Sequence, residues 1–246
     1  MKFLEHAGQY FILLSKVFAK PEKYSLYYRQ TIREIENLGI NSFGIVVIIS
    51  FFIGAVITIQ TNYNLENPLL PRYLVGVTVR DSLLLEFSST MVALILAGKV
   101  GSSIASEIGT MRVSEQIDAL EIMGVNSASY LILPKIVAAL FFFPILSLLS
   151  MFVGVFGGYL TCLFTDTLPP SDYIYGIQYM FYPHYISYSI TKVFFYSFLI
   201  VTMSAYQGYY AQGGALEVGR SSTKAVVYSS ILVLLSNLIL TKLILS

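Results

Sequence analysis

Long apolar runs separated by short polar segments dominate this chain and predict membrane-spanning helices. The first run, Phe43 to Thr61, contains no charged residue and is long enough to cross a bilayer as a helix. A second span is expected over about Ser82–Ile108. The third run, Ile136–Thr165, exceeds one upright span, which favours a single tilted or kinked helix. Further spans are expected over about Ile186–Ala211 and Ala225–Leu245. The polar, turn-rich segment 62–80 is expected to connect the first two spans.

The first 20 residues show helical periodicity without the length of a span. Their apolar side chains share one face, and their polar side chains lie elsewhere. This pattern predicts a helix in the membrane interface, with an ordinary packed amphipathic helix as the alternative. Residues 1–40 are therefore expected to form an interfacial and cytoplasmic segment, and residues 41–246 a five-span domain. The apolar face comprises Phe3, Ala7, Phe11, Leu14 and Phe18, and the polar residues are Lys2, Glu5, Gln9 and Lys16.

The segment 110–124 is charged although it lies between two apolar runs. Val113, Ile117 and Leu120 recur at helical spacing, and Met123 continues that stripe. Charge is costly inside a bilayer, so this segment is expected to leave it as a short amphipathic helix. Such a helix is suited to docking on a soluble partner. Its polar positions include Arg112, Glu115, Gln116, Asp118 and Glu121, and Gly109 and Gly124 are expected to mark its ends.

Small residues recur at helical spacing in the second expected span. Gly101, Ala105 and Gly109 form one ridge, beside a second ridge of Gly98, Ser102 and Ser106. Small residues at this spacing let helix backbones approach closely in lipid. The ridges are expected to pack against other helices of the same chain, with dimer contact as the alternative.

The distribution of lysine and arginine predicts the orientation of the five spans. With the N-terminus inside, eleven of these 15 residues fall on the inner side and four on the outer side. This arrangement places segment 110–124 in the cytoplasm and the C-terminus outside. The four residues assigned to the outer side are Arg72, Arg80, Lys192 and Lys242.

Composition supports a membrane protein and excludes several other classes. The mean hydropathy is +0.71, and 12% of residues are charged, against about 25% in soluble domains. A net charge of +1 gives no case for nucleic-acid binding. The single Cys162 excludes an intrachain disulfide, and two distant histidines do not predict a metal site or a cofactor. No phosphate-binding G-x-x-x-x-G-K-[ST] loop is present, so energy for any ATP-driven process must come from another subunit.

Several motifs resemble the MlaE/YrbE permease family, the membrane subunits of ABC systems that move lipids together with MCE-domain proteins. The resemblance covers about residues 40–245, and its central block is long and specific. The matching segments are 97–101 (AGKVG), 105–113 (ASEIGTMRV), 115–124 (EQIDALEIMG), 219–227 (GRSSTKAVV), and 52–54 (FIG) with Gln60.

The resemblance implies a homodimer of five-span permeases in the bacterial inner membrane. It also implies cytoplasmic ATPase subunits, an MCE protein on the outer side, and a phospholipid cavity between the two permeases. The family glutamate that lines this cavity corresponds to Glu86. Many members carry an arginine just before it, where this chain has Leu85, and an aspartate in the last span, where it has Asn237.

The candidate sites follow from these expectations. Glu86 and Gln60 are expected at the lipid cavity, and Arg112, Glu115, Asp118 and Glu121 at the ATPase contact. Each site has an alternative interpretation. Glu86 could be a hydrated residue at the membrane interface near Arg80, and Gln60 could only cap the outer end of the first span. The charged residues of segment 110–124 could form a solvated helix face without a partner. Glu86→Gln is expected to preserve folding while changing lipid transport.

The expected protein is therefore a non-enzymatic permease subunit that moves phospholipid between the inner membrane and an MCE protein. An intramembrane lipid-modifying enzyme would need a positioned set of nucleophile, acid and base. A passive assembly scaffold would account for the cytoplasmic helix but not for a polar Glu86 near the outer boundary. Both remain alternatives.

Overall fold

The computed structural model describes residues 2–19, 24–65, 70–165 and 168–245. Within these ranges the chain is helical and contains no β-strand. Five segments are long and apolar enough to cross a membrane, which confirms the predicted all-α polytopic fold. The candidate spans are Tyr27–Asn64, Leu74–Val113, Ser127–Phe164, His184–Tyr209 and Ala215–Ile244.

The first two spans are longer than their apolar cores and are built from several helical pieces. Hydropathy marks only the apolar part of each, whereas backbone hydrogen bonding extends the helix through polar residues on either side. The predicted connection over 62–80 is therefore too long, because helix already occupies both of its ends. The first span consists of α2 (Tyr24–Glu34), the π-helix η1 (Ile35–Ile40) and α3 (Asn41–Asn64). The second consists of α4 (Leu74–Ser82), η2 (Leu83–Met91), α5 (Val92–Leu96), η3 (Ala97–Gly101) and α6 (Ser102–Val113).

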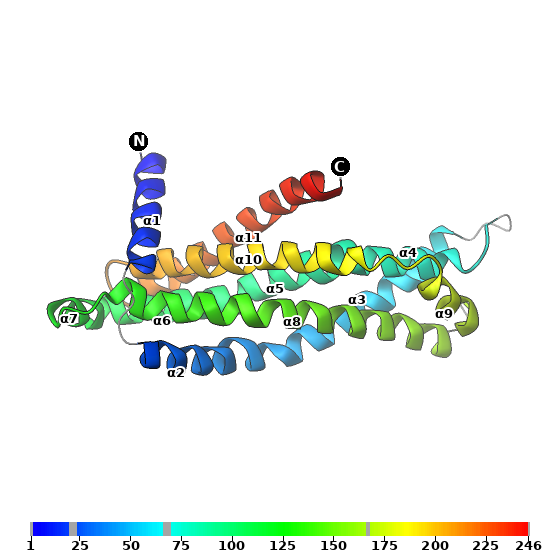
Figure 1. Cartoon of the computed structure of the whole chain (residues 1–246), viewed down its shortest axis with the longest axis horizontal. Coiled ribbons are helices and arrows are strands. Elements are labelled where there is room, and N and C mark those ends of the chain that lie inside the picture. The colour runs from blue at the N-terminus through cyan, green and yellow to red at the C-terminus, as the bar shows by residue number, and fades with distance from the viewer. Residues whose placement is uncertain (1, 20–23, 66–69, 166–167, 246) are drawn as a thin grey trace. The chain divides into compact units, whose positions relative to one another are not determined.

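The third apolar run is one unbroken helix, α8 (Ser127–Phe164), as expected from its length (Figure 1). It begins nine residues before the predicted start, because its first two turns carry polar residues. The remaining helices are α1 (Lys2–Phe18), α7 (Gln116–Ile122), α8 (Ser127–Phe164), α9 (Pro170–Gln178), α10 (His184–Tyr209) and α11 (Ala215–Leu245).

The chain divides into two compact units. Unit 1 contains residues 1–42, 93–143 and 194–246, and unit 2 contains residues 43–92 and 144–193. Within each unit, glycines at the helix contacts allow neighbouring helices to approach closely.

In unit 1, the second span packs closely on α10 and α11. A Cβ atom at Gly208 would lie 2.7 Å from the carbonyl oxygen of Ala105, and one at Gly101 would lie 2.8 Å from Ser204 Oγ. Gly109 faces Val218 at the start of α11. The ridge of Gly101, Ala105 and Gly109 therefore packs within the chain, as predicted. Gly109 lies inside α6 and does not end a helix, contrary to expectation, because helix packing is its role here.

Helix α1 also packs in unit 1, with one face buried and another exposed. Leu13 and Val17 are buried, and Tyr10 Oη lies 2.8 Å from Thr202 Oγ1 on α10. Phe11 and Phe18, from the predicted interfacial face, are exposed. One side of α1 thus packs against the protein through Leu13 and Val17, which lie off the predicted apolar face, and Phe11 and Phe18 of that face remain exposed. The interfacial location of α1 stays a prediction.

In unit 2, glycines bring α3 and α8 into backbone contact. A Cβ atom at Gly54 would collide with the backbone of Gly154, and one at Gly157 would collide with the carbonyl oxygen of Phe51. The core of unit 2 lies beside this contact and joins α4, α8 and α9. It contains Val75, Val79, Leu83, Cys162, Leu168 and Tyr173.

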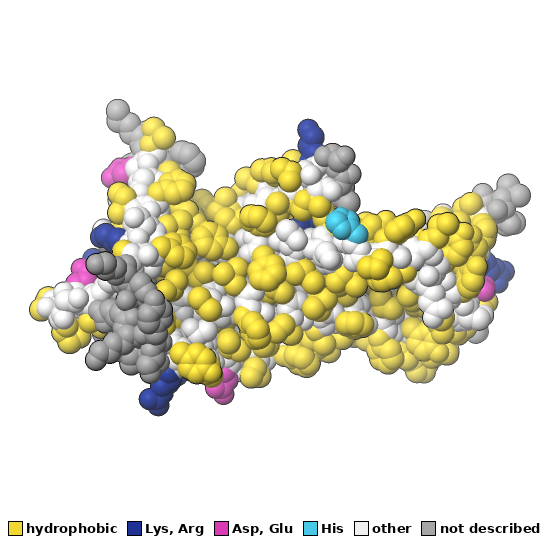
Figure 2. Space-filling view, in the orientation of Figure 1, with side chains coloured by type: hydrophobic (Ala, Val, Ile, Leu, Met, Phe, Trp, Pro, Cys, Tyr) yellow, Lys and Arg dark blue, Asp and Glu magenta, His cyan; other side chains and the backbone are white. Residues whose placement is uncertain are grey.

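Hydrophobic side chains cover most of the visible molecular surface (Figure 2). Helices α3 and α11 carry many of the exposed ones, including Phe52 and Val56 on α3 and Leu234, Leu238 and Leu243 on α11. A surface of this kind is stable in lipid rather than in water.

Candidate functional site

Glu86 lies in η2, a π-helical stretch in the first half of the second span. A π-helix is rare and occurs frequently at functional sites, because its wider turn displaces side chains from the regular helical positions. The Glu86 carboxylate accepts a hydrogen bond from Thr90 Oγ1 at 2.9 Å, one turn further along the chain. Its side chain is 41% exposed, although the surrounding segment is apolar.

Lys192 on α10 is the partner of Glu86, and both residues belong to unit 2. Lys192 Nζ lies 2.8 Å from Glu86 Oε2 and 3.3 Å from the carbonyl oxygen of Leu85. It also lies 3.2 Å from Tyr188 Oη and 4.8 Å from the centre of the Tyr188 ring. The Lys192 side chain is fully buried. The ammonium group therefore depends on Glu86 for charge balance.

This pairing was missed from the sequence, where Lys192 was assigned to the outer surface. The signal was present, since a lysine inside an apolar helix needs a partner or a water-filled cavity. Leu85 stands at the position where the family resemblance led us to expect an arginine. In this chain the positive charge comes instead from α10, and Leu85 contributes its backbone carbonyl. Removing Lys192 from the orientation count leaves eleven inner residues against three outer ones, so the predicted orientation is unchanged.

Arg80 does not serve as the partner of Glu86. Its guanidinium is buried and contacts Asp81 Oδ1 at 2.8 Å, together with the backbone carbonyl groups of Ile177 and Tyr179 at the end of α9. Gln60, the other residue predicted at the lipid cavity, has an exposed side chain near the end of α3. Asn237 on α11 accepts hydrogen bonds from Tyr196 Oη at 2.9 Å and from Thr241 Oγ1 at 3.3 Å. The uncharged Asn237 thus links α11 to α10 through a hydrogen bond within unit 1.

The charged segment 110–124 forms a corner followed by a short helix. Its first residues, 110–113, complete α6, and the chain turns at Glu115, whose φ is +59°. Helix α7 then runs over Gln116–Ile122, shorter than predicted, and Gly124 follows with φ +78°. Arg112 Nη1 and Asp118 Oδ1 lie 2.6 Å apart across the corner, with both side chains partly exposed.

The apolar stripe predicted for this helix is only partly correct. Ile117 is fully buried, whereas Met123 is 68% exposed and its neighbour Ile122 is 87% exposed. The helix ends at Ile122, so the helical period no longer places Met123 on the buried face. Two large apolar side chains therefore point outward at the end of α7, next to Glu121. Such an exposed pair on a short polar helix is suited to contact with another protein.

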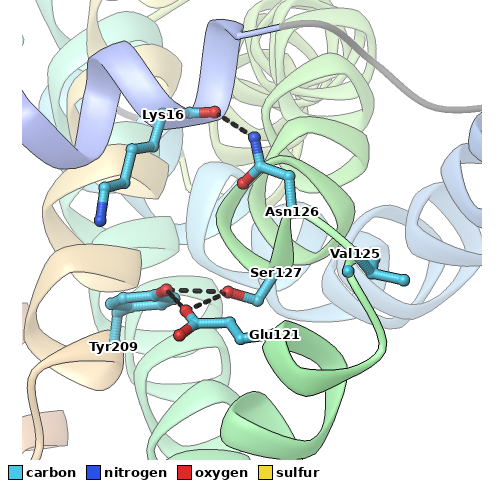
Figure 3. A pocket seen from close by; sticks show the side chains of 7 residues that line it. Lys16, Glu121, Val125, Asn126, Ser127 and Tyr209 are labelled. Atoms are coloured by element: carbon cyan, nitrogen blue, oxygen red, sulfur yellow. Dashed lines mark hydrogen bonds between the residues drawn. The ribbon is translucent and has the colours of Figure 1, made fainter.

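Glu121 connects α7 with two spans of unit 1. Its Oε1 accepts hydrogen bonds from Ser127 Oγ and Tyr209 Oη, each at 2.9 Å, and these two hydroxyl oxygens lie 2.8 Å apart. Figure 3 shows the three groups converging, Ser127 from the start of α8 and Tyr209 from the end of α10. We call this triangle the Glu121 latch. The two hydroxyl donors hold the pKa of Glu121 below its usual range.

The latch lines a pocket of about 380 Å³ that also reaches α1. Asn126 donates from Nδ2 to the carbonyl oxygen of Lys16 at 2.8 Å, which ties the end of α1 to the start of α8 (Figure 3). Glu121 was predicted on the outward, partner-facing side of the helix. In the structure its carboxylate instead makes internal contacts.

A second buried lysine supports the same end of unit 1. Lys135 Nζ lies 2.7 Å from both Glu34 Oε1 and Glu107 Oε2, and its side chain is 2% exposed. This cluster joins the end of α2 to α6 and α8. Sequence reasoning assigned Lys135 only to the inner surface, because the partner residues lie far away along the chain.

Comparison with known proteins agrees with these features. The profile described as Permease MlaE matches residues 31–243. A probable ABC transporter permease protein of Rickettsia bellii is 38% identical over 89% of this chain and 84% of its own length. The chloroplastic protein TRIGALACTOSYLDIACYLGLYCEROL 1 of Arabidopsis thaliana is 30% identical over 94% of this chain and 65% of its own length. The intermembrane phospholipid transport system permease protein MlaE of Haemophilus influenzae is 27% identical over 94% of this chain and 88% of its own length. With five candidate spans and a match to nearly all of its length, the chain belongs to the MlaE permease family.

Proposed function

We propose that this permease moves phospholipid between the bacterial inner membrane and an outer-side MCE protein, driven by a separate cytoplasmic ATPase. Family membership supports a permease, and the name of the Haemophilus influenzae relative supports phospholipid as the substrate class. The Rickettsia bellii relative is named an ABC transporter permease, which supports an ATP-driven system. A second copy of the chain would complete the lipid cavity. The N-terminus would face the cytoplasm and the C-terminus the periplasm.

The Glu86–Lys192 pair is the observation that carries the lipid-site proposal. It places a satisfied pair of opposite charges between otherwise apolar spans, with the lysine buried and the carboxylate partly exposed. A phospholipid also combines apolar chains with a charged headgroup. The carboxylate would therefore face the headgroup, and Lys192 would hold it in place through their ion pair. Gln60 is proposed as a further polar contact of this path.

Helix α7 is proposed as the contact with the ATPase. Ile122 and Met123 supply exposed apolar area, and Glu115 at the corner supplies exposed charge. Arg112 and Asp118 brace the corner, and the Glu121 latch ties the helix to α8 and α10. We propose that these three residues fix the angle of α7, whereas the exposed ones bind the partner.

The lipid proposal is tested in proteoliposomes that contain the permease and its ATPase, with labelled phospholipid and an MCE-domain acceptor. ATP should cause transfer of chemically unchanged lipid, and a variant with both Glu86→Gln and Lys192→Met should transfer much less. Transfer that is independent of ATP, or equal in the variant, would contradict the proposal. Recovery of a chemically modified lipid would indicate an intramembrane enzyme instead.

The coupling proposal is tested by co-purification. Ile122→Ser should reduce recovery of the ATPase, because it removes an exposed apolar contact, whereas Leu238→Ser on α11 should not. Equal recovery with Ile122→Ser and wild type would contradict docking through α7. Retained assembly in every variant, with no ATPase stimulation, would indicate a passive scaffold.

A further inference from the structure

The segment between α9 and α10 presents an exposed apolar loop that none of the proposed sites uses. Met180, Phe181 and Tyr182 are 63%, 43% and 52% exposed. No Asp, Glu, Lys or Arg occurs between Asp172 and Lys192. This loop belongs to unit 2 and joins directly to α10, which is a candidate span. We refer to residues 180–182 as the apolar loop.

A buried arginine builds the base of the apolar loop. Arg80 is 2% exposed and donates from Nη1 to the carbonyl oxygens of Ile177 at 2.9 Å and Tyr179 at 2.6 Å. Its guanidinium also lies 5.9 Å from the centre of the Phe181 ring. The arginine thus satisfies the carbonyl groups at the end of α9 and fixes the direction in which the chain leaves it.

The backbone at the tip is in an unfavourable conformation. Met180 has φ +45°, in the left-handed region that favours glycine and is costly for a residue with a Cβ atom. The left-handed backbone at Met180 thus coincides with a large apolar side chain that is 63% exposed. Strain of this kind, together with exposure, indicates a functional surface.

We infer that the apolar loop inserts into the headgroup and acyl boundary of the membrane. Tyrosine, phenylalanine and methionine without formal charge match the composition of this boundary. Helix α10 begins at His184, so the loop is held at the membrane end of a span. From His184 to Lys192 the helix rises by about 12 Å, which places the Glu86–Lys192 pair within the adjoining leaflet. In the proposed orientation this is the outer leaflet.

The inference does not depend on lipid transport, and the absence of tryptophan from the chain gives a direct test. Full-length protein carrying Tyr182→Trp is reconstituted into phosphatidylcholine vesicles whose acyl chains carry bromine near the glycerol or near the methyl end. Bromine near the glycerol should quench the indole most strongly, and aqueous iodide should quench it weakly. Strong iodide quenching without bromine quenching would overturn the inference. Protection from both quenchers would indicate a protein contact and would also overturn it.

Reference positions calibrate the measurement in the same chain. Leu234→Trp lies nearer the middle of the exposed apolar face of α11 and should respond most to bromine near the methyl end. Ile122→Trp, on the exposed end of α7, should respond to iodide.

A matched pair of changes at Met180 then tests what holds the loop in the bilayer. Asparagine and aspartate both tolerate the left-handed conformation, but only aspartate adds charge. In the Tyr182→Trp background, Met180→Asp should abolish most bromine quenching, whereas Met180→Asn should retain it. Equal quenching in the two variants would show that this loop does not sit at a depth where charge is excluded, and would overturn the inference.

Discussion

Lys192 Nζ lies 2.8 Å from Glu86 Oε2, although 106 residues separate them in the sequence. The two side chains differ in exposure, since Lys192 is fully buried and Glu86 is 41% exposed. An ammonium group that has lost its water depends on its counter-ion more than a partly exposed carboxylate does. The pair is therefore asymmetric, and removal of one partner is not equivalent to removal of the other.

Glu86→Gln should destabilise the permease more than Lys192→Met does. The first change removes the carboxylate that is paired with the buried ammonium group of Lys192, and breaking a buried ion pair in this way costs about 3–5 kcal/mol. The second leaves a carboxylate that still accepts a hydrogen bond from Thr90. Thermal unfolding of the purified variants measures the difference. The combined variant should recover stability but not lipid transfer, and equal destabilisation by the two single changes would contradict this prediction. The sequence-based expectation that Glu86→Gln preserves folding predicts the opposite result, and the same measurement decides between them.

Tyr209→Phe should weaken the coupling between ATP hydrolysis and lipid transfer while leaving assembly intact. The change removes one donor of the Glu121 latch and retains the ring. We expect normal co-purification of the ATPase and fewer lipids moved per ATP. Tyr210→Phe, next to it in the chain, serves as the control and should behave as wild type. If both variants moved as many lipids per ATP as wild type, the latch would have no role in coupling.

The contribution of Glu121 to stability should disappear in acid. Its pKa is lowered in the folded protein, so the folded state favours the ionised form. This contribution is complete above the ordinary carboxyl pKa and is lost as the pH falls through the lowered one. The difference in thermal stability between wild type and Glu121→Gln should thus be constant at neutral pH and shrink in acid. A difference that grows on acidification would contradict the assigned direction.

Gly54→Ala should separate α3 from α8 and destabilise unit 2. The added methyl group would collide with the backbone of Gly154, which cannot move aside as a flexible side chain could. Gly44→Ala on the same helix is the control, because nothing lies within 4 Å of its Cβ position. Thermal unfolding should show a large loss for the first variant and little change for the second. Similar stabilities would indicate that the two helices are not in close contact.

The fold was predictable from the sequence to the extent that apolar length determines a span. The five spans were identified, yet their ends were misplaced, as at α4, because a helix continues into polar residues without an apolar signal. The packing of Gly101 and Gly109 was also predictable, since the spacing of small residues defines a helix face.

The pairing of charges was less predictable, because periodicity identifies a face but not what lies opposite. Glu86 was recognised, but Lys192, Lys135 and the inward contacts of Glu121 depend on helices brought together only by folding. The exposure of Met123 had a different cause. It followed from the end of α7 one residue earlier, and helix ends are the least certain part of a sequence-based assignment.

The left-handed Glu115 has a consequence for how this protein tolerates change. A residue with a Cβ atom at φ +59° costs about 1 kcal/mol relative to glycine, so glycine would relax the backbone at the corner before α7. The same replacement would widen the range of directions in which the chain can leave α6. Folding stability and angular definition of α7 therefore oppose each other at this position. Glu115→Gly should therefore raise the thermal stability of the protein and, at the same time, make the direction of α7 toward its partner less uniform.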